Sequence, residues 1–174
     1  MDGFLRIGIT REKIFPGEAA MIESYLKDGT LDYVHIRKPE EDTDKVRRLI
    51  SGIDTEAHCR LRLHDHFMLF GEFGLAGVHL NRRNPDAPEG CMSVTRSCHT
   101  LEELEDSGRY SYVTLSPIFD SISKMGYVSK FRLDELPAAL GGKRVVALGG
   151  VTPEAFPALR EAGFIGAAML GWLW

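Results

Sequence analysis

The stretch RVVALGGV, at residues 144–151, is the most informative part of the sequence. Its apolar run ends in two glycines, and Thr152 and Pro153 follow it. The run predicts a buried parallel strand, since such strands pack on both faces. Glycine allows positive φ and close backbone approach, and Thr152 with Pro153 fits a helix N-cap followed by the first helical position. Bare amides at a helix start favour an anion. Gly149 and Gly150 are therefore candidate phosphate-binding residues, with a simple tight turn as the alternative.

The composition indicates one globular domain over residues 1–174. The chain is 44% hydrophobic and 26% charged, and its formal net charge of -4 comes from interspersed acidic and basic residues. No basic face points to nucleic acid. Cys59, Cys91 and Cys98 lack the spacing of a zinc or redox motif, which predicts reduced thiols and a cytoplasmic location. No leader-like start is seen, and no segment reaches the roughly 18 apolar residues of a membrane span. We expect a small-molecule ligand, with no nucleic acid and no membrane as partner.

Short apolar runs alternate with helical patterns along the chain. Helices are predicted over residues 18–27, 43–50 and 155–162, and a capping box at Thr100 predicts another. The predicted strands cover residues 4–10, 32–37, 59–65, 76–80, 91–97, 110–116, 144–150 and 165–171. Alternation of this kind predicts parallel strands.

Eight such units predict a compact (β/α)8 TIM barrel. The usual size is about 250 residues, so the helices must be shortened. The Asn, Pro and Gly residues of segment 81–90 prevent a long helix there, and the sequence stops at Trp174, directly after the last strand, with no final helix. Trp172 and Trp174 would then leave apolar surface, for which a homo-oligomer or a further segment would provide cover. A doubly wound open sheet is the alternative fold.

Polar residues gather where the predicted strands end, which is the catalytic face of a TIM barrel. These residues are Arg37, Lys38, His64, Asp65, Asn84, Ser97, His99, Ser121, Ser123 and Lys124. Each alone is readily explained as a solvated strand end. Together, arginines and lysines facing a glycine loop indicate a substrate with more than one anionic group.

Several motifs carry a family resemblance. Arg37 after a strand, His64 with Asp65, GVHL (77–80), SCHT (97–100), SPIFDSISK (116–124) and ALGGV (147–151) occur in a characteristic order and spacing. In these motifs the chain resembles the thiamine phosphate synthase and thiazole tautomerase superfamily over nearly its whole length. The most specific elements are SCHT followed by an acidic helix and the SPIFDSISK segment.

The synthase branch implies a phosphorylated small-molecule substrate pair. By resemblance, the pyrimidine diphosphate would be held by Arg37, Asp65, Ser97, Ser121, Ser123 and Lys124 with Mg²⁺, and thiazole phosphate by Gly149, Gly150 and Gly171. The match is partial, because His35, Pro39 and His64 replace the family's Gln, Lys and Asn. Lys38 would supply a displaced cation, and Asp65 is the candidate metal ligand. Asn84 stands where the second metal-binding carboxylate belongs, and an amide is a poor substitute for Mg²⁺.

The tautomerase branch needs no cofactor, and it is the interpretation that Asn84 and His99 favour. It implies His99 as the acid/base that shifts a proton on a thiazole phosphate, a role suited to imidazole. A packed histidine at a helix start is the structural alternative for His99. The SPIFDSISK segment, with Lys124 as a catalytic residue, supports instead a Mg²⁺-dependent synthase that couples hydroxymethylpyrimidine diphosphate to thiazole phosphate. A non-catalytic thiazole-phosphate-binding regulatory barrel and another phosphate-binding barrel enzyme are further alternatives.

Overall fold

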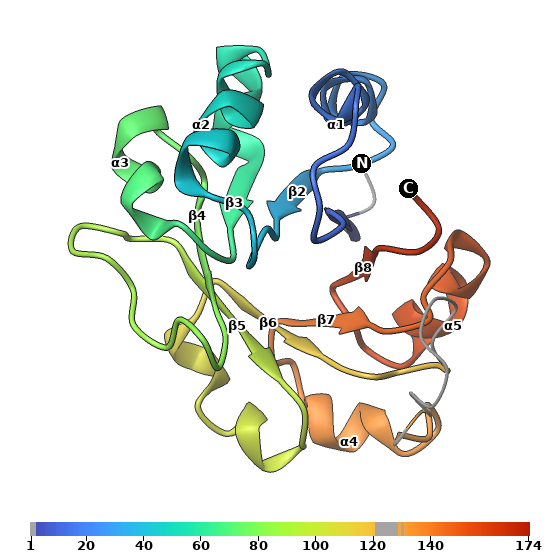
Figure 1. Cartoon of the computed structure of the whole chain (residues 1–174). Helices are drawn as coiled ribbons and strands as arrows, with labels where there is room; N and C mark the ends of the chain where they lie inside the picture. Colours follow the sequence, from blue (N-terminus) through green and yellow to red (C-terminus); the bar gives the residue numbers. More distant parts are fainter. Residues whose placement is uncertain (1–2, 121–128, 130) are drawn as a thin grey trace. The chain divides into compact units, whose positions relative to one another are not determined.

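The fold is an eight-stranded parallel barrel, as the sequence predicts. The structure is a computed structural model that describes residues 3–120, 129 and 131–174. The strands pair in sequence order in a closed barrel. Figure 1 labels most of these strands and the helices between them. This closed order rules out the doubly wound open sheet. The strands are β1 (Leu5–Ile9), β2 (Tyr33–Ile36), β3 (Leu61–Leu63), β4 (Gly77–Leu80), β5 (Val94–Cys98), β6 (Tyr112–Leu115), β7 (Val145–Leu148) and β8 (Gly166–Met169).

The helices are short, as expected for a barrel of this length. Among the described residues they are α1 (Glu18–Lys27), α2 (Thr43–Ser51), α3 (Phe70–Phe73), α4 (Leu136–Leu140) and α5 (Phe156–Glu161). The Asp42 carboxylate caps α2 by accepting a hydrogen bond from the Lys45 backbone N–H at 2.9 Å. Val46, Leu49 and Ile50 form the buried face of α2. The local signals in the sequence therefore account for the two longest helices.

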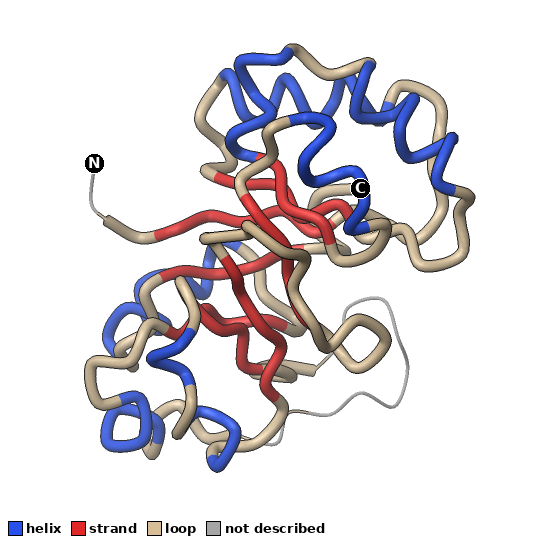
Figure 2. Tube along the Cα trace, turned by 90° about the vertical axis from the view of Figure 1, so that its left-hand side faces the viewer, coloured by secondary structure: helices blue, strands red, loops and turns tan. Residues whose placement is uncertain are grey.

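Residues 8–94 form one compact unit. Its strands β2, β3 and β4 pair in parallel, with Ile36 opposite Leu63 and Leu63 opposite Val78. These apolar side chains are fully or almost fully buried, and the helices of this unit lie on one side of its strands (Figure 2). Because side chains alternate along a strand, His35 and His79 point to the opposite face. That polar face carries the candidate chemistry.

Residues up to 7 and residues 95–174 form a second compact unit. Here β6, β7 and β8 pair in parallel, with Val113 opposite Val145 and Ala147 opposite Ala167. All four side chains are fully buried, which gives this unit an apolar core of its own. Gly149 follows β7 directly, as the run at residues 144–151 predicts.

The segment after β5 differs from its prediction. In place of an α-helix, short 3₁₀ turns cover Glu102–Leu104 and Ser107–Arg109. The capping contact itself forms, because the Glu103 backbone N–H donates to Thr100 Oγ1 at 3.4 Å. Ser107 and Gly108 favour turns over helix, and β6 begins soon after them. The predicted helix was therefore wrong, although its start signal was real.

The helix after β7 also begins differently. Thr152 has extended backbone but makes no side-chain capping hydrogen bond, and a 3₁₀ turn at Pro153–Ala155 precedes α5. Thr152 is the N-cap of this turn and Pro153 is its first residue, as predicted, although the Thr152 side chain does not make the capping contact. Beyond β8, the Trp172 side chain is exposed and Leu173 is buried. Across the described part of the chain, no helix combines the length and the apolar character needed to cross a membrane.

Candidate functional site

Asp65 is the centre of a polar cluster in the unit of residues 8–94. Its Oδ1 accepts hydrogen bonds from Arg83 Nη2 at 3.0 Å and from Asn84 Nδ2 at 3.1 Å, and its Oδ2 accepts one from the Lys38 backbone N–H at 3.2 Å. Asp65 is buried, whereas the Arg83 side chain is 47% exposed. The cluster thus holds one guanidinium at the surface by a buried carboxylate.

Arg37 follows β2 in the same unit. Its guanidinium pairs with the Glu12 carboxylate at 2.7 Å, and its backbone N–H donates to Thr10 Oγ1 at 2.9 Å. The Arg37 and Glu12 side chains are 24% and 40% exposed. A partly exposed ion pair contributes only about 0–1 kcal/mol, so a dianionic ligand can compete with Glu12 for Arg37.

Lys38 does not fit its predicted role as a substrate cation. The side chain is fully buried, and its Nζ lies 2.7 and 2.9 Å from the two carboxylate oxygens of Glu18. The same Nζ also donates to the carbonyl oxygens of Arg11 at 2.7 Å and Lys13 at 3.1 Å. Burial lowers the pKa of Lys38, while Glu18 acts in the opposite direction. Lys38 therefore fixes the segment before α1 and has no donor left for a substrate.

The donor set around Asp65 does not fit the magnesium ion that the resemblance implies. Mg²⁺ prefers one or two carboxylates together with substrate phosphates and water. The carboxylate of Asp65 already carries the Arg83 guanidinium, and position 84 turns an amide donor toward it where a second carboxylate would be needed. The positive charge at this position is thus supplied by Arg83.

His64 belongs to a buried group of three imidazoles. Its Nε2 lies 2.8 Å from His35 Nδ1, and its ring stacks on that of His79 with centroids 4.1 Å apart. Burial lowers the pKa of His64 well below its ordinary value, and the nearby imidazoles and the charges of Arg37 and Arg83 lower it further. His64 was predicted from the sequence as a substrate-binding residue, but its grouping with His35 and His79 was not. Histidines on successive strands were the available signal.

His99 lies in the second unit, directly after β5. Its Nδ1 is 3.2 Å from Ser116 Oγ and 3.3 Å from the Ser116 carbonyl oxygen, and its backbone N–H donates to the Glu103 carboxylate. Ser97, in β5, is half-buried. Cys98 between them is fully buried, and burial raises the pKa of its thiol to about 11. His99 is therefore an oriented imidazole, whereas Cys98 is an inert core residue.

Gly149 and Gly150 have φ values of +96° and +61°. An added Cβ at Gly150 would lie 2.1 Å from the Asp120 carbonyl oxygen, and one at Gly149 would lie 2.9 Å from Pro117 Cα. Close packing on the chain itself thus requires both glycines. Among the described residues, the amides of Gly150 and Val151 donate to no backbone carbonyl. Gly171 is exposed in the turn after β8.

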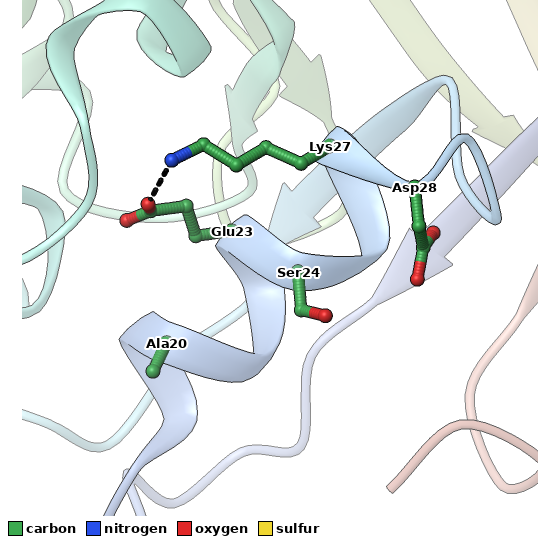
Figure 3. Close-up of a pocket in the computed structure, with 5 residues that line it drawn as sticks. All are labelled: Ala20, Glu23, Ser24, Lys27 and Asp28. Carbon is green, nitrogen blue, oxygen red and sulfur yellow. Dashed lines mark hydrogen bonds and ion pairs between the residues drawn. The ribbon is translucent and has the colours of Figure 1, made fainter.

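The remaining predicted residues, Ser121, Ser123 and Lys124, lie outside the described residues. A surface hollow against α1 is a different feature (Figure 3). Its lining residues all come from α1 and its C-cap, and Lys27 is paired there with Glu23 at 2.5 Å. None of them was predicted as a site residue. The candidate chemistry therefore lies at the strand ends.

Curated proteins that match this chain are named thiamine-phosphate synthase. A family model described as thiamine monophosphate synthase matches residues 8–173. The thiamine-phosphate synthase of Levilactobacillus brevis is 28% identical over 142 residues, which are 71% of this chain and 65% of that relative. The chain thus spans just under two thirds of that relative's length. The thiamine-phosphate synthase of Bacteroides thetaiotaomicron is 24% identical over 162 residues, covering 83% of this chain and 78% of the relative.

Solved structures agree with the family model. A thiamine phosphate pyrophosphorylase from Bacteroides thetaiotaomicron superposes with a TM-score of 0.86 and 35% identity, covering 98% of this chain and 85% of that chain. The thiamine phosphate pyrophosphorylase of Pyrococcus furiosus, at 17% identity and a TM-score of 0.77 over 97% of this chain and 86% of that chain, shows the shared fold. The chain described here belongs to the thiamine monophosphate synthase family.

Proposed function

We propose that this chain is a thiamine-phosphate synthase that joins hydroxymethylpyrimidine diphosphate to thiazole phosphate. In this reaction the thiazole nitrogen forms a bond to the pyrimidine methylene carbon, and the carbon–oxygen bond to the diphosphate breaks with release of pyrophosphate. The observation that carries the proposal is the family match over residues 8–173, with relatives named for this activity. It favours the synthase over the tautomerase reading.

Arg37 and Arg83 are proposed to bind the diphosphate. Guanidinium groups match phosphate oxygens with paired donors, and they stabilise the charge that develops on the leaving group. Asp65 acts as a positioning residue, because it holds Arg83 by a 3.0 Å ion pair while Asn84 donates to the same oxygen. Ser97, Ser121, Ser123 and Lys124 are assigned to the same substrate by the family pattern.

The thiazole phosphate is proposed to bind at the loop after β7. The backbone amides of Gly150 and Val151 can donate to phosphate oxygens, and Gly171 after β8 completes the family pattern. Backbone amides bind phosphate without a charged side chain. In this assignment, the negative charge of the diphosphate is bound by Arg37 and Arg83.

Chromatographic detection of thiamine phosphate from the two purified substrates tests the proposal. We expect product with the wild-type chain and a loss of at least tenfold in Arg37→Ala and Lys124→Ala. Lys45→Ala is the matched control, because among the described residues its exposed side chain on α2 pairs with Glu41 and Asp42. Absence of coupling in a folded wild-type chain would overturn the assignment.

A thiazole tautomerase is the second candidate, and the geometry of His99 favours it. An imidazole 3.2 Å from the Ser116 hydroxyl is held in one orientation, as proton transfer requires. His99→Ala should then abolish tautomer conversion, whereas Ser116→Ala should reduce it. Calorimetry with thiazole phosphate covers the regulatory alternative, which requires tight binding with turnover of neither substrate set.

A further inference from the structure

Three imidazoles converge on the polar face of β2, β3 and β4. His35 comes from β2, His79 from β4, and His64 follows β3 directly. Their candidate ligand nitrogens all lie within 4.8 Å of one another, and all three residues are buried. Strand register explains the convergence, since the paired strands bring alternate residues to one face. Apolar packing of a core does not require three adjacent buried histidines.

We propose that His35, His64 and His79 form a binding site for a divalent transition metal ion of the Zn²⁺ type, with water as the remaining ligand. Three histidines plus one open position is the donor set of catalytic zinc sites. Imidazole suits Zn²⁺, Co²⁺ and Cu²⁺ but not Mg²⁺, which prefers oxygen. The site is therefore distinct in chemistry from a magnesium site on Asp65.

The state of the imidazoles suits a metal. In its neutral form, each imidazole has one ring nitrogen with a lone pair that can bind a metal ion. His35 Nδ1 and His64 Nε2 are 2.8 Å apart, which is a hydrogen bond between a donor and an acceptor nitrogen. A bound ion replaces this hydrogen bond, after the shared proton moves to the other nitrogen of its ring. No proton is lost from the pair in this exchange.

Positive charges near the three imidazoles repel a metal dication. Arg62 affects His35, and Arg37 and Arg83 affect His64, each through its positive charge. These charges weaken binding of a dication without removing the lone pairs, so ligation must outweigh repulsion. Entry is easiest past His64, which is 5% exposed, whereas His35 and His79 are fully covered.

Titration of the chelator-treated full chain with Co²⁺ tests the site without any substrate, so its outcome is independent of the proposed reaction. We expect one equivalent to give the visible bands of low-coordinate cobalt, to be displaced by Zn²⁺ and to be unaffected by excess Mg²⁺. A thiolate-to-cobalt charge-transfer band would place the ion on a cysteine and overturn the proposal. Absence of stoichiometric binding would overturn it as well.

Substitution assigns the ligands. His35→Gln and His79→Gln should each weaken Co²⁺ binding by more than about a hundredfold, since even partners outside the coordination sphere are worth about 10- to 100-fold. His58→Gln is the matched control: His58 is buried, but its Nε2 contacts the carbonyl oxygens of Ile50 and Ile53. Equal affinity in the wild type and His79→Gln would refute the assignment.

Zinc X-ray absorption of the wild-type chain gives an answer even if a variant fails to fold. We expect scattering from three imidazole rings and one oxygen. A shell with one imidazole or fewer would mean that the ion binds elsewhere.

Discussion

Replacement of Lys38 by Met tests the placement of this residue most sharply. Met keeps most of the aliphatic stem and removes the ammonium group. The change deletes contacts to both carboxylate oxygens of Glu18 at 2.7 and 2.9 Å and to the carbonyl oxygens of Arg11 and Lys13 at 2.7 and 3.1 Å. Glu18, which is 1% exposed, is left as a buried charge without its partner.

The expected loss in free energy of unfolding is large. Removal of one partner of a buried ion pair costs about 3–5 kcal/mol. For a chain of this length, 1 kcal/mol corresponds to about 2–4 °C, so the midpoint should fall by about 6–20 °C. Lys45→Met is the control, because Lys45 and its partner Asp42 are 53% and 59% exposed, and such a surface pair is worth about 0–1 kcal/mol.

Urea denaturation measures these free energies of unfolding. The variants are Lys38→Met, the control Lys45→Met and the double variant Glu18→Met/Lys38→Met. The double variant buries no charge, so we expect it to recover most of the loss, since apolar replacement of a buried pair is often neutral or stabilising. A loss below about 1 kcal/mol in Lys38→Met, or a double variant less stable than the single, would refute the placement.

The pH dependence has a definite sign. Burial raises the pKa of Glu18, and loss of the Lys38 charge raises it further. An acid whose folded-state pKa exceeds its unfolded value destabilises the folded chain above that pKa, and protonation relieves this as pH falls. The difference in free energy of unfolding between wild type and Lys38→Met should therefore narrow as the pH falls. A constant or widening difference contradicts this reasoning.

Further predictions concern the two candidate substrate sites and the buried thiol. Arg83→Ala frees the Asp65 carboxylate, so coupling should depend more on Mg²⁺ than in the wild type, and identical Mg²⁺ titrations would contradict the role of Arg83. Gly150→Ala combines a positive φ with a backbone clash, so urea denaturation should show a loss of about 2–5 kcal/mol. A change below about 1 kcal/mol there would contradict the observed packing. Iodoacetamide should modify exposed Cys59 far faster than Cys98, whose pKa is about 11, and rapid labelling of native Cys98 would contradict its burial.

The sequence predicted the strands well because each is a short apolar run between turn residues. The two longest helices could also be predicted from the sequence. For α2, the N-cap Asp42 and the spacing of Val46 and Ile50 are local features. The helix predicted after Thr100 was wrong. A capping signal marks where a helix can begin, but it does not show that Ser107 and Gly108 favour turns soon afterwards. Local sequence patterns were therefore sufficient for those elements whose start and end depend on neighbouring residues.

The site was less accessible from sequence. Lys38 follows Arg37 at a strand end, and only the structure shows that its side chain turns to Glu18. The grouping of His35 with His79 depends on strand register, which links residues far apart in the chain. Similarly, the ion pair between Arg83 and Asp65 joins residues that lie 18 positions apart in the chain. Contacts between distant segments were the missing information.

The proposed synthase activity is tested by an assay of thiamine phosphate formation from hydroxymethylpyrimidine diphosphate and thiazole phosphate. We expect stoichiometric release of pyrophosphate with the wild-type chain and at least a tenfold lower rate in Arg37→Ala, while Lys45→Ala retains the wild-type rate. A folded wild-type chain that binds thiazole phosphate but forms no thiamine phosphate would contradict it.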